Sequence, residues 1–430
     1  MEKGIDIHNY DKQLVSTLRR MKESNISEKN KKIIEKFGDF CFASGIGKAR
    51  VVKYTQTLKQ LALWLKKDFD RATKQDIEKV VISIQQRDDY SEWTKKDFNV
   101  TLKKFYKWLK GKGEFPPEVK WISIRVNRSK VKLPGQEGLL TEDDIKKLIE
   151  STDHPRNKAL ISLLYESGCR VGEIASLQVN NIAFDEKGAV LTVLGKTGAR
   201  RIRIVSSVPH LLTWINSHPM KDNPKSPLWT NIGAVNNRKH MQYGTIRTFL
   251  EKLFKRAGIK KRFNPHLFRH SRATFLANFL TEAQLKVYFG WVQGSDIAGT
   301  YVHLSGRDTD QKILEINGIA EENKKKEQEL KPKICPRCNS INSFNSNYCS
   351  KCASILDTLT AMKEQEKMMH EDKKLKFGDD IMNEAMKNEK IREGLLEIVH
   401  KAERYIVFKL LRSGTIILFV MAKCIFNLFL

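Results

Sequence analysis

The sequence predicts a mostly α-helical protein of several domains, with one small β-hairpin or sheet in an α+β domain. Its 430 residues are enough for about three folding units of roughly 150 residues each. Apolar residues recur at helical spacing over most of the chain, whereas residues 189–205 hold the one convincing pair of β-prone runs. Four of the seven cysteines lie within residues 335–352, which indicates a small separate unit held together by its cysteines.

The first domain is expected over residues 1–115 and is helical. Between residues 27 and 111, apolar side chains recur at helical spacing in four successive runs. Thr73, followed three residues later by Asp76, forms a capping-box pattern at the start of the third run. We therefore expect a four-helix domain, followed by a basic, proline-containing linker over residues 116–137.

The charge of the chain indicates a polyanionic partner. Lys and Arg number 77 against 50 Asp and Glu, a formal net charge of +27, which exceeds what solubility requires. Double-stranded DNA is the expected partner, because basic residues crowd the last helix of the first domain and the linker after it. A solvated helix face, a ribosomal protein or a membrane-surface protein would show a similar composition, so the motifs must decide. The expected DNA contacts are Lys95, Lys96, Lys103, Lys104, Lys107, Arg125, Arg128, Lys130, Lys132, Arg200 and Arg201.

The second domain is expected over residues 138–318. An apolar helix that begins at Pro155 ends at Gly168, so Arg170 emerges from a helix end, where it can meet an anion. The two β-prone runs surround a Gly-containing turn, which predicts a hairpin with Lys196 near its tip.

A second motif of this domain lies at residues 264–274. Asn264 is a predicted N-cap and Pro265 the first helical residue, which sets His266 and Arg269 on one face of the helix. The partial positive charge of the helix N-terminus adds to theirs. This end of the helix is therefore also suited to an anion.

The order of these features resembles the tyrosine recombinase (phage-type integrase) family. R-x-G-E, a hairpin lysine, H-x-x-R-H, G-W and Y-x-H follow one another across about 130 residues. The resemblance is strong over residues 141–308, and the basic helical domain before them agrees with the core-binding domain of the family. The final motifs look most like archaeal integrases. By resemblance, the catalytic residues are Arg170, Lys196, His266, Arg269, Trp291 and Tyr301, supported by Glu173 and His303.

These residue types suit phosphodiester chemistry. Arg170 and Arg269 can hold the non-bridging oxygens of a phosphate, whose charge grows during in-line attack. Tyr301 is a phenol with an ordinary pKa near about 10, so it needs a proton acceptor, for which His266 is available. Lys196 can protonate the leaving 5′-oxygen. Trp291 could donate its indole N–H to the phosphate, or only pack the wall of the site.

The expected function is a site-specific recombinase that cleaves and rejoins duplex DNA through a 3′-phosphotyrosyl bond, to integrate or excise a mobile element. The motifs contain no carboxylate cluster, so no catalytic metal is expected. Because a phosphotyrosine ester keeps the energy of the broken bond, no nucleotide cofactor is expected either. By resemblance, a homotetramer would act on paired sites, with accessory DNA-bending proteins as further partners. Two alternatives stay open: relaxation of DNA in the manner of a type IB topoisomerase, and DNA-binding regulation without catalysis.

The cysteine-rich unit, residues 334–353, follows a charged linker at residues 319–333. It holds two C-x₂-C pairs separated by ten residues, a pattern typical of a tetrahedral zinc site with no open position. We expect a zinc ribbon whose metal is structural. Whether it contacts DNA or a protein stays open. The expected zinc ligands are Cys335, Cys338, Cys349 and Cys352.

The C-terminal part comprises a charged helical segment, residues 354–404, and an apolar tail, residues 405–430. The longest uncharged run of the tail, residues 413–422, is too short to span a bilayer alone. Docking on another protomer is favoured over membrane anchoring. With no signal-peptide pattern at the N-terminus, a cytoplasmic, nucleoid-associated protein is expected.

Overall fold

The computed structural model describes residues 6–111, 113–126, 136–195, 198–233, 238–305, 313, 316–318 and 330–413. The chain forms two compact units. The first comprises Met1–Ile334 with Ser340–Phe344, and the second comprises Cys335–Asn339 with Asn345–Leu430. The mostly helical architecture with small antiparallel sheets confirms the predicted fold class.

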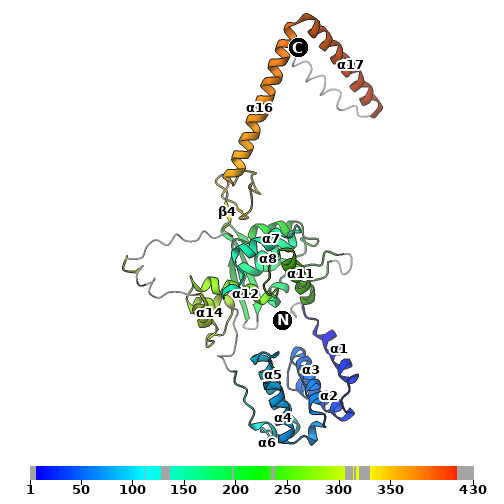
Figure 1. Cartoon of the computed structure of the whole chain (residues 1–430), viewed down its shortest axis with the longest axis vertical. Helices are drawn as coiled ribbons and strands as arrows, with labels where there is room; N and C mark the ends of the chain where they lie inside the picture. Colours follow the sequence, from blue (N-terminus) through cyan, green and yellow to red (C-terminus); the bar gives the residue numbers. More distant parts are fainter. Residues whose placement is uncertain are drawn as a thin grey trace. The chain divides into compact units, whose positions relative to one another are not determined.

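The N-terminal helices are drawn in blue and cyan in Figure 1. The four predicted helices correspond to α2 to α5, and the capping box of Thr73 and Asp76 is present at the start of α4. Helix α1 and the single turn α6 were not predicted. Phe37, Phe69 and Phe105 meet edge to face in the core. The elements are α1 (Tyr10–Lys22), α2 (Glu28–Ala43), α3 (Lys48–Leu65), η1 (Phe69–Arg71), α4 (Lys74–Gln85), α5 (Glu92–Leu109) and α6 (Pro117–Lys120).

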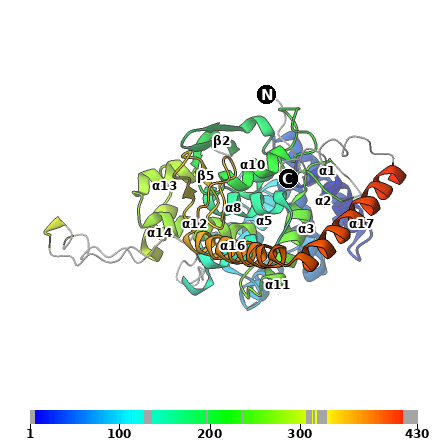
Figure 2. The same ribbon diagram turned by 90° about the horizontal axis from the view of Figure 1, so that it is seen from above.

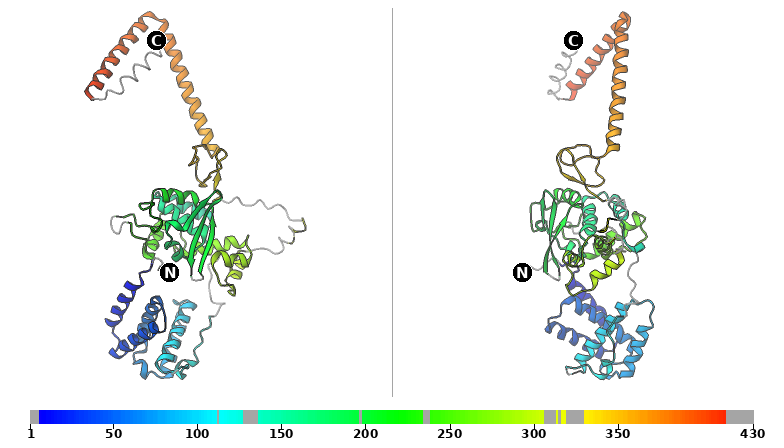
Figure 3. Two further views of the ribbon diagram at one scale, coloured as in Figure 1. Left: turned by 180° about the vertical axis from the view of Figure 1, so that it is seen from behind. Right: turned by 90° about the vertical axis from the view of Figure 1, so that its left-hand side faces the viewer.

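The rest of the first unit combines helices with a three-stranded sheet, whose strands are seen from behind in Figure 3. Strands β2 and β3 are the predicted hairpin, and β1 is an additional edge strand. Gly195 pairs with Gly198 at the end of the hairpin, and residues 196 and 197 between them lie outside the described residues. The strands are β1 (Ile182–Asp185), β2 (Gly188–Gly195) and β3 (Gly198–Ile204).

The helices of this part surround a continuous apolar core. The order is η3 (Gln136–Gly138), α7 (Glu142–Glu150), α8 (Pro155–Ser167), α9 (Val171–Ala175), η4 (Val179–Asn181), α10 (Val208–Asn216), α11 (Tyr243–Arg256), α12 (Pro265–Ala277), α13 (Glu282–Phe289) and α14 (Ile297–Ser305). Helix α8 begins at Pro155 and ends at Gly168, as predicted, and Gly168 adopts a left-handed conformation with φ of 55°. Helices α12, α13 and α14 lie together in Figure 2 and share a small core of their own.

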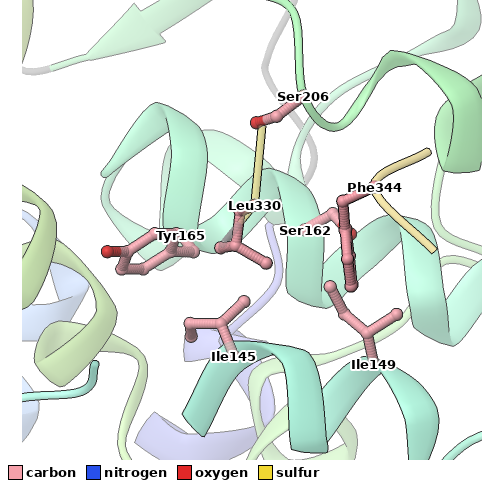
Figure 4. A pocket seen from close by; sticks show the side chains of 7 residues that line it. All are labelled: Ile145, Ile149, Ser162, Tyr165, Ser206, Leu330 and Phe344. Carbon is pink, nitrogen blue, oxygen red and sulfur yellow. The ribbon is translucent and has the colours of Figure 1, made fainter. Parts of the chain in front are cut away.

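A short hairpin closes the first unit. Strands β4 (Lys333–Ile334) and β5 (Ile341–Asn342) pair antiparallel. Leu330 and Phe344, on either side of this hairpin, pack against Ile145 and Ile149 of α7 and Tyr165 of α8 around a narrow hollow (Figure 4). These contacts belong to the core of the first unit rather than to the cysteine-rich unit.

The second unit contains the cysteine pairs and two long helices, α16 (Thr358–Lys387) and α17 (Glu389–Ser413). The helices cover the predicted charged helical segment and continue a few residues further. Most of the apolar tail lies outside the described residues. In the part of the chain that the structure describes, no helix combines the length and the apolar character needed to cross a membrane.

Candidate active site and metal centre

Glu173 organises the arginines at the start of α9. Its side chain is 4% exposed and lies between Arg170 and Arg200. One carboxylate oxygen accepts from Arg170 Nη1 at 3.0 Å and Arg200 Nη1 at 2.9 Å, and the other accepts from the Arg170 backbone N–H at 2.9 Å and Arg200 Nη2 at 2.7 Å. Burial opposes ionisation of Glu173, but the hydrogen bonds from Arg200 and Arg170 outweigh it and lower the pKa. The carboxylate therefore fixes two guanidinium groups at once.

The hairpin approaches Glu173 closely because residue 195 is glycine. A β-carbon on Gly195 would lie 2.5 Å from a carboxylate oxygen of Glu173, which is well inside van der Waals contact. Arg200, on the next strand, also donates to the carbonyl of Tyr288 at 3.1 Å. The hairpin that carries Lys196 is thereby tied to α9 and α13.

Arg269 lies deeper than Arg170. It is 5% exposed, and its guanidinium donates to the carbonyls of Gly168 at 2.9 Å and Phe289 at 2.7 Å. The group also lies 5.4 Å from the centre of the Trp291 ring, in cation–π range. Burial and the nearby charge of Arg170 lower the pKa of Arg269 to about 10, which still leaves it charged at neutral pH.

Tyr301 and Trp291 form a stacked pair. Their rings are parallel to within 1° and their centres are 5.2 Å apart, and Trp291 also stacks on Phe289 at 4.9 Å. Tyr301, on α14, is 6% exposed. Burial raises the pKa of Tyr301 to about 12, although the charge of Arg269 acts in the opposite direction. The phenol is therefore protonated at neutral pH.

The histidine that meets the Tyr301 hydroxyl is His270, which the sequence pattern contained but to which we assigned no role. His270 Nδ1 lies 2.5 Å from the hydroxyl oxygen. His266, the expected proton acceptor, is exposed in the first turn of α12, with its ring centre 6.4 Å from that of His270. The signal for His270 was present, because residues four apart share one helix face.

The surroundings of His266 and His270 lower the pKa of both rings and favour the neutral form. Burial, followed by the charges of His266 and Arg269, lowers the pKa of His270. For His266, partial loss of hydration and the charges of Arg269 and Arg170 lower the pKa. Each ring can therefore accept a proton at neutral pH.

Several predicted site residues lie outside the described part of the chain. Lys196, which the sequence places between the end of β2 and the start of β3, is not described. The backbone of His303 belongs to α14, but its side chain is not described. The linker residues Arg128, Lys130 and Lys132 also lie outside the described residues.

The remaining basic residues divide into two groups. Arg200 is a correction to the predicted DNA contacts: its side chain is only 11% exposed and is bound by Glu173, so it acts inside the domain. Lys103 donates to the carbonyls of Lys120 and Ile122 at 3.3 and 2.9 Å, which holds the segment after α6. Arg125 and Arg201 are exposed. Lys96, whose Nζ lies 5.1 Å from the centre of the Trp93 ring, lines a groove of about 440 Å³ with Arg125, Trp93, Ile124 and Val126.

Lys95, Lys104 and Lys107 complete the predicted set. Lys95 donates to the carbonyl of Gln85 at 2.9 Å, and Lys107 lies 5.1 Å from the centre of the Phe115 ring. Lys95 and Lys107 thus have local partners, and a contact with DNA would compete with these interactions. Lys104 is half-buried.

The four predicted metal ligands come together in the second unit. The sulfur atoms of Cys335, Cys338, Cys349 and Cys352 lie within 4.8 Å of one another. Two of the separations, Cys335–Cys352 and Cys338–Cys349, are 3.6 Å. Four sulfurs at about 2.3 Å from a zinc ion would be about 3.8 Å apart, so the cluster has the size of a tetrahedral thiolate site.

The two cysteine pairs repeat one backbone geometry. Asn339 and Ala353, each directly after the second cysteine of a pair, have φ of 54° and 57°. The N–H of each donates at 2.9 Å to the carbonyl of the first cysteine of its pair. This repeated turn points both sulfurs of each pair toward one centre, which indicates a structural metal site compatible with zinc.

Comparison with known proteins covers most of the first unit. Residues 139–307 match the model of the phage integrase family. A tyrosine recombinase of Thermosipho africanus is 27% identical over 256 residues, which is 57% of this chain and 85% of the relative. Tyrosine recombinase XerA of Pyrococcus furiosus is 36% identical over 139 residues, which is 32% of this chain and 47% of the relative.

Two solved structures share the fold. The integrase of the Tn1549 transposon, in complex with transposon right end DNA, has a TM-score of 0.51 and 15% identity, and the match covers 67% of this chain and 99% of that chain. The XerH site-specific recombinase, bound to its palindromic difH substrate, has a TM-score of 0.50 and 18% identity, with coverage of 74% and 98%.

Proposed function

This chain belongs to the tyrosine recombinase family, and from that membership we propose that it cleaves and rejoins duplex DNA at specific sites through a covalent 3′-phosphotyrosyl intermediate. Site-specific recombination is the activity common to the family. The finer proposal is that Tyr301 is the nucleophile and that the enzyme integrates or excises a mobile element. Double-stranded DNA is its partner, and a homotetramer acts on two paired sites.

One observation carries the proposal. The only tyrosine of α14 stacks on Trp291, and Trp291 in turn lies against the guanidinium of Arg269. A nucleophile, an aromatic wall and a phosphate-binding cation thus occupy one connected site, with Arg170 bound to the carbonyl of Gly290 at 3.4 Å. This combination suits attack on a phosphodiester better than any other reaction of these groups.

The residues divide the reaction as follows. Arg170 and Arg269 stabilise the charge on the non-bridging oxygens, and His266, exposed at the N-terminus of α12, is available to bind the same phosphate. The Tyr301 oxygen forms a bond to phosphorus as the bond to the 5′-oxygen breaks. Lys196 protonates that oxygen.

The reverse reaction completes the exchange. The phosphotyrosine ester retains the bond energy of the phosphodiester, so a 5′-hydroxyl from another strand can attack it without ATP. The proposed zinc ion is structural, because four thiolates leave no open coordination position. We also expect the cysteine-rich unit to contact DNA, on the ground of its charge, and accessory DNA-bending proteins to take part, on the ground of the family.

The test uses DNA that flanks the gene. Repeated sequences at the ends of an integrated element provide candidate sites, which are made as nicked suicide substrates so that the cleaved strand cannot be resealed. We expect an SDS-resistant protein–DNA adduct with the parent protein and none with Tyr301→Phe. The Phe variant retains its DNA affinity, since one hydroxyl contributes little to a large electrostatic interface.

Tyr288→Phe is the matched control. Tyr288 is a tyrosine of the same domain whose hydroxyl donates to the carbonyl of Glu166 at 3.0 Å, so this variant should still form the adduct. An adduct with Tyr301→Phe would show that the nucleophile is misassigned. Relaxation of plasmids without recombination between two sites would favour the topoisomerase-like alternative, and binding without any adduct from the parent protein would favour a regulator.

A further inference from the structure

We propose that His270 is the general base of the reaction, and that its Nδ1 takes the proton of the Tyr301 hydroxyl as the phenol oxygen attacks phosphorus. The inference rests on the proposed function and adds a catalytic residue to it. His270 lies outside the set of residues that the sequence motifs assign to catalysis.

The geometry suits direct transfer. Nδ1 of His270 and the hydroxyl oxygen of Tyr301 are 2.5 Å apart, at the short end of the range for a proton shared between oxygen and a strong acceptor. In the tautomer that carries its proton on Nε2, Nδ1 has a free lone pair, and the hydroxyl donates to it. In that tautomer the reacting proton lies between the two groups.

The surroundings leave few other acceptors. Tyr301 is 6% exposed and one face of its ring is covered by Trp291, which limits the access of water to the hydroxyl. Burial also raises the pKa of Tyr301 to about 12, so attack at neutral pH without a base would be slow. A base in contact with the hydroxyl lowers this barrier, because it can take the proton as the bond to phosphorus forms and the phenol becomes more acidic.

The charges around His270 favour its neutral form. Burial, followed by the charges of His266 and Arg269 on its own helix, lowers the pKa of His270. Tyr301 is the titratable partner that faces it from α14. No charged group of α8 or α13 among the described residues contributes to the shift. His270 therefore starts the reaction as a free base.

The proton balance closes over the cycle. Cleavage transfers one proton from Tyr301 to His270 Nδ1, forms the bond between the tyrosine oxygen and phosphorus, and releases the 5′-oxygen, which takes its proton from Lys196. In religation the attacking 5′-hydroxyl gives its proton to the neutral amine of Lys196, and the imidazolium of His270 returns its proton to the departing tyrosine oxygen.

A purely positioning role makes a different prediction. An asparagine at position 270 offers an amide oxygen as hydrogen-bond acceptor but has no basicity near neutral pH. If His270 only holds the hydroxyl in place, His270→Asn should keep most of the activity. If His270 is the base, the variant should lose it.

The experiment is single-turnover cleavage of a suicide substrate between pH 5 and pH 9.5, in the full-length protein. For the parent we expect a rate that falls on the acid side as His270 becomes protonated, with a midpoint below the ordinary histidine pKa of about 6.5. For His270→Asn we expect a loss of about 10²- to 10⁴-fold at pH 7, the usual scale of general base catalysis. The midpoint that reports His270 should disappear, and the rate should instead rise steadily over the whole pH range as the phenolate fraction of Tyr301 grows.

His154→Asn is the matched control. His154 is the N-cap of α8, where its side chain accepts from the Arg156 N–H, and asparagine is an equally good N-cap. This variant should keep the rate and the pH profile of the parent. Thermal unfolding and DNA affinity establish that all variants are folded and bind substrate.

The outcomes distinguish a failure of the proposed function from a failure of the role of His270. A parent protein that forms no adduct contradicts the proposed function itself. A parent that cleaves, together with a His270→Asn variant that retains its rate within a few-fold and its acid limb, overturns only the role of His270.

Discussion

Replacing Glu173 by glutamine tests whether one buried carboxylate holds the arginines of the site together. Each of its two oxygens accepts two hydrogen bonds, from Arg170 and Arg200 in both cases. A glutamine keeps the shape but replaces one oxygen by an NH₂ group that faces two donors, so two of the four hydrogen bonds are lost in either orientation. Removing the charge also leaves two guanidinium groups without their counter-ion.

The expected loss of stability follows from the number of hydrogen bonds that glutamine cannot make. A hydrogen bond to a charged group contributes about 1.5–3 kcal/mol, and breaking a buried ion pair by removing one partner costs about 3–5 kcal/mol. We therefore expect Glu173→Gln to lower the free energy of unfolding by about 3–5 kcal/mol and to slow DNA cleavage, because Arg170 loses its fixed position. Burial raises the pKa of Glu173, but the hydrogen bonds from Arg200 and Arg170 outweigh burial, so the pKa is lowered in the folded protein. The stabilisation is therefore present above the ordinary glutamate pKa and is lost as the pH falls through the lowered value.

The assay is urea unfolding followed by tryptophan fluorescence, with cleavage measured in parallel. Asp185→Asn is the matched control, because Asp185 binds Arg203 at 2.6 Å on the same sheet, with both side chains more than 40% exposed. Exposed pairs contribute little to stability, so this variant should resemble the parent. Equal stability of the two variants would refute the reasoning, as would a Glu173→Gln protein that cleaves at the rate of the parent.

Three further predictions concern other parts of the molecule. Lys196→Ala should slow cleavage by about 10²- to 10⁴-fold, and a substrate with sulfur in place of the bridging 5′-oxygen should restore the rate because a thiol needs no acid; equal defects on both substrates would argue against the acid role. Metal analysis should find one zinc per chain and its loss in Cys335→Ser/Cys352→Ser, whereas retained metal would exclude the four-thiolate site. Phe344→Ala should lower the thermal unfolding temperature of the first unit, because its ring packs on α7 and α8; an unchanged temperature would mean that the hairpin contributes no stability there.

Much of the architecture was readable from local sequence. The capping box at Thr73 and the N-cap at Asn264 before Pro265 start helices where predicted, and Thr141 forms a capping box of the same kind at the start of α7. Gly168, in a left-handed conformation, ends α8, so Arg170 lies beyond this helix, directly before α9. Such signals depend on residues within one or two turns of each other, so the sequence contains the whole interaction. The spacing of the four cysteines is local in the same sense.

Contacts between distant elements were decided by the tertiary structure. Arg200 looked like a surface cation, but the pairing of β3 with β2 carries it to the carboxylate of Glu173. His270 meets Tyr301 only because α12 and α14 pack through a shared apolar core. No periodicity or spacing encodes these meetings, since they depend on how apolar faces far apart in the sequence fit together. The sequence by itself determined most of the residues proposed for the chemistry, whereas the packing of α12 and α14 added His270 to them by bringing it to Tyr301.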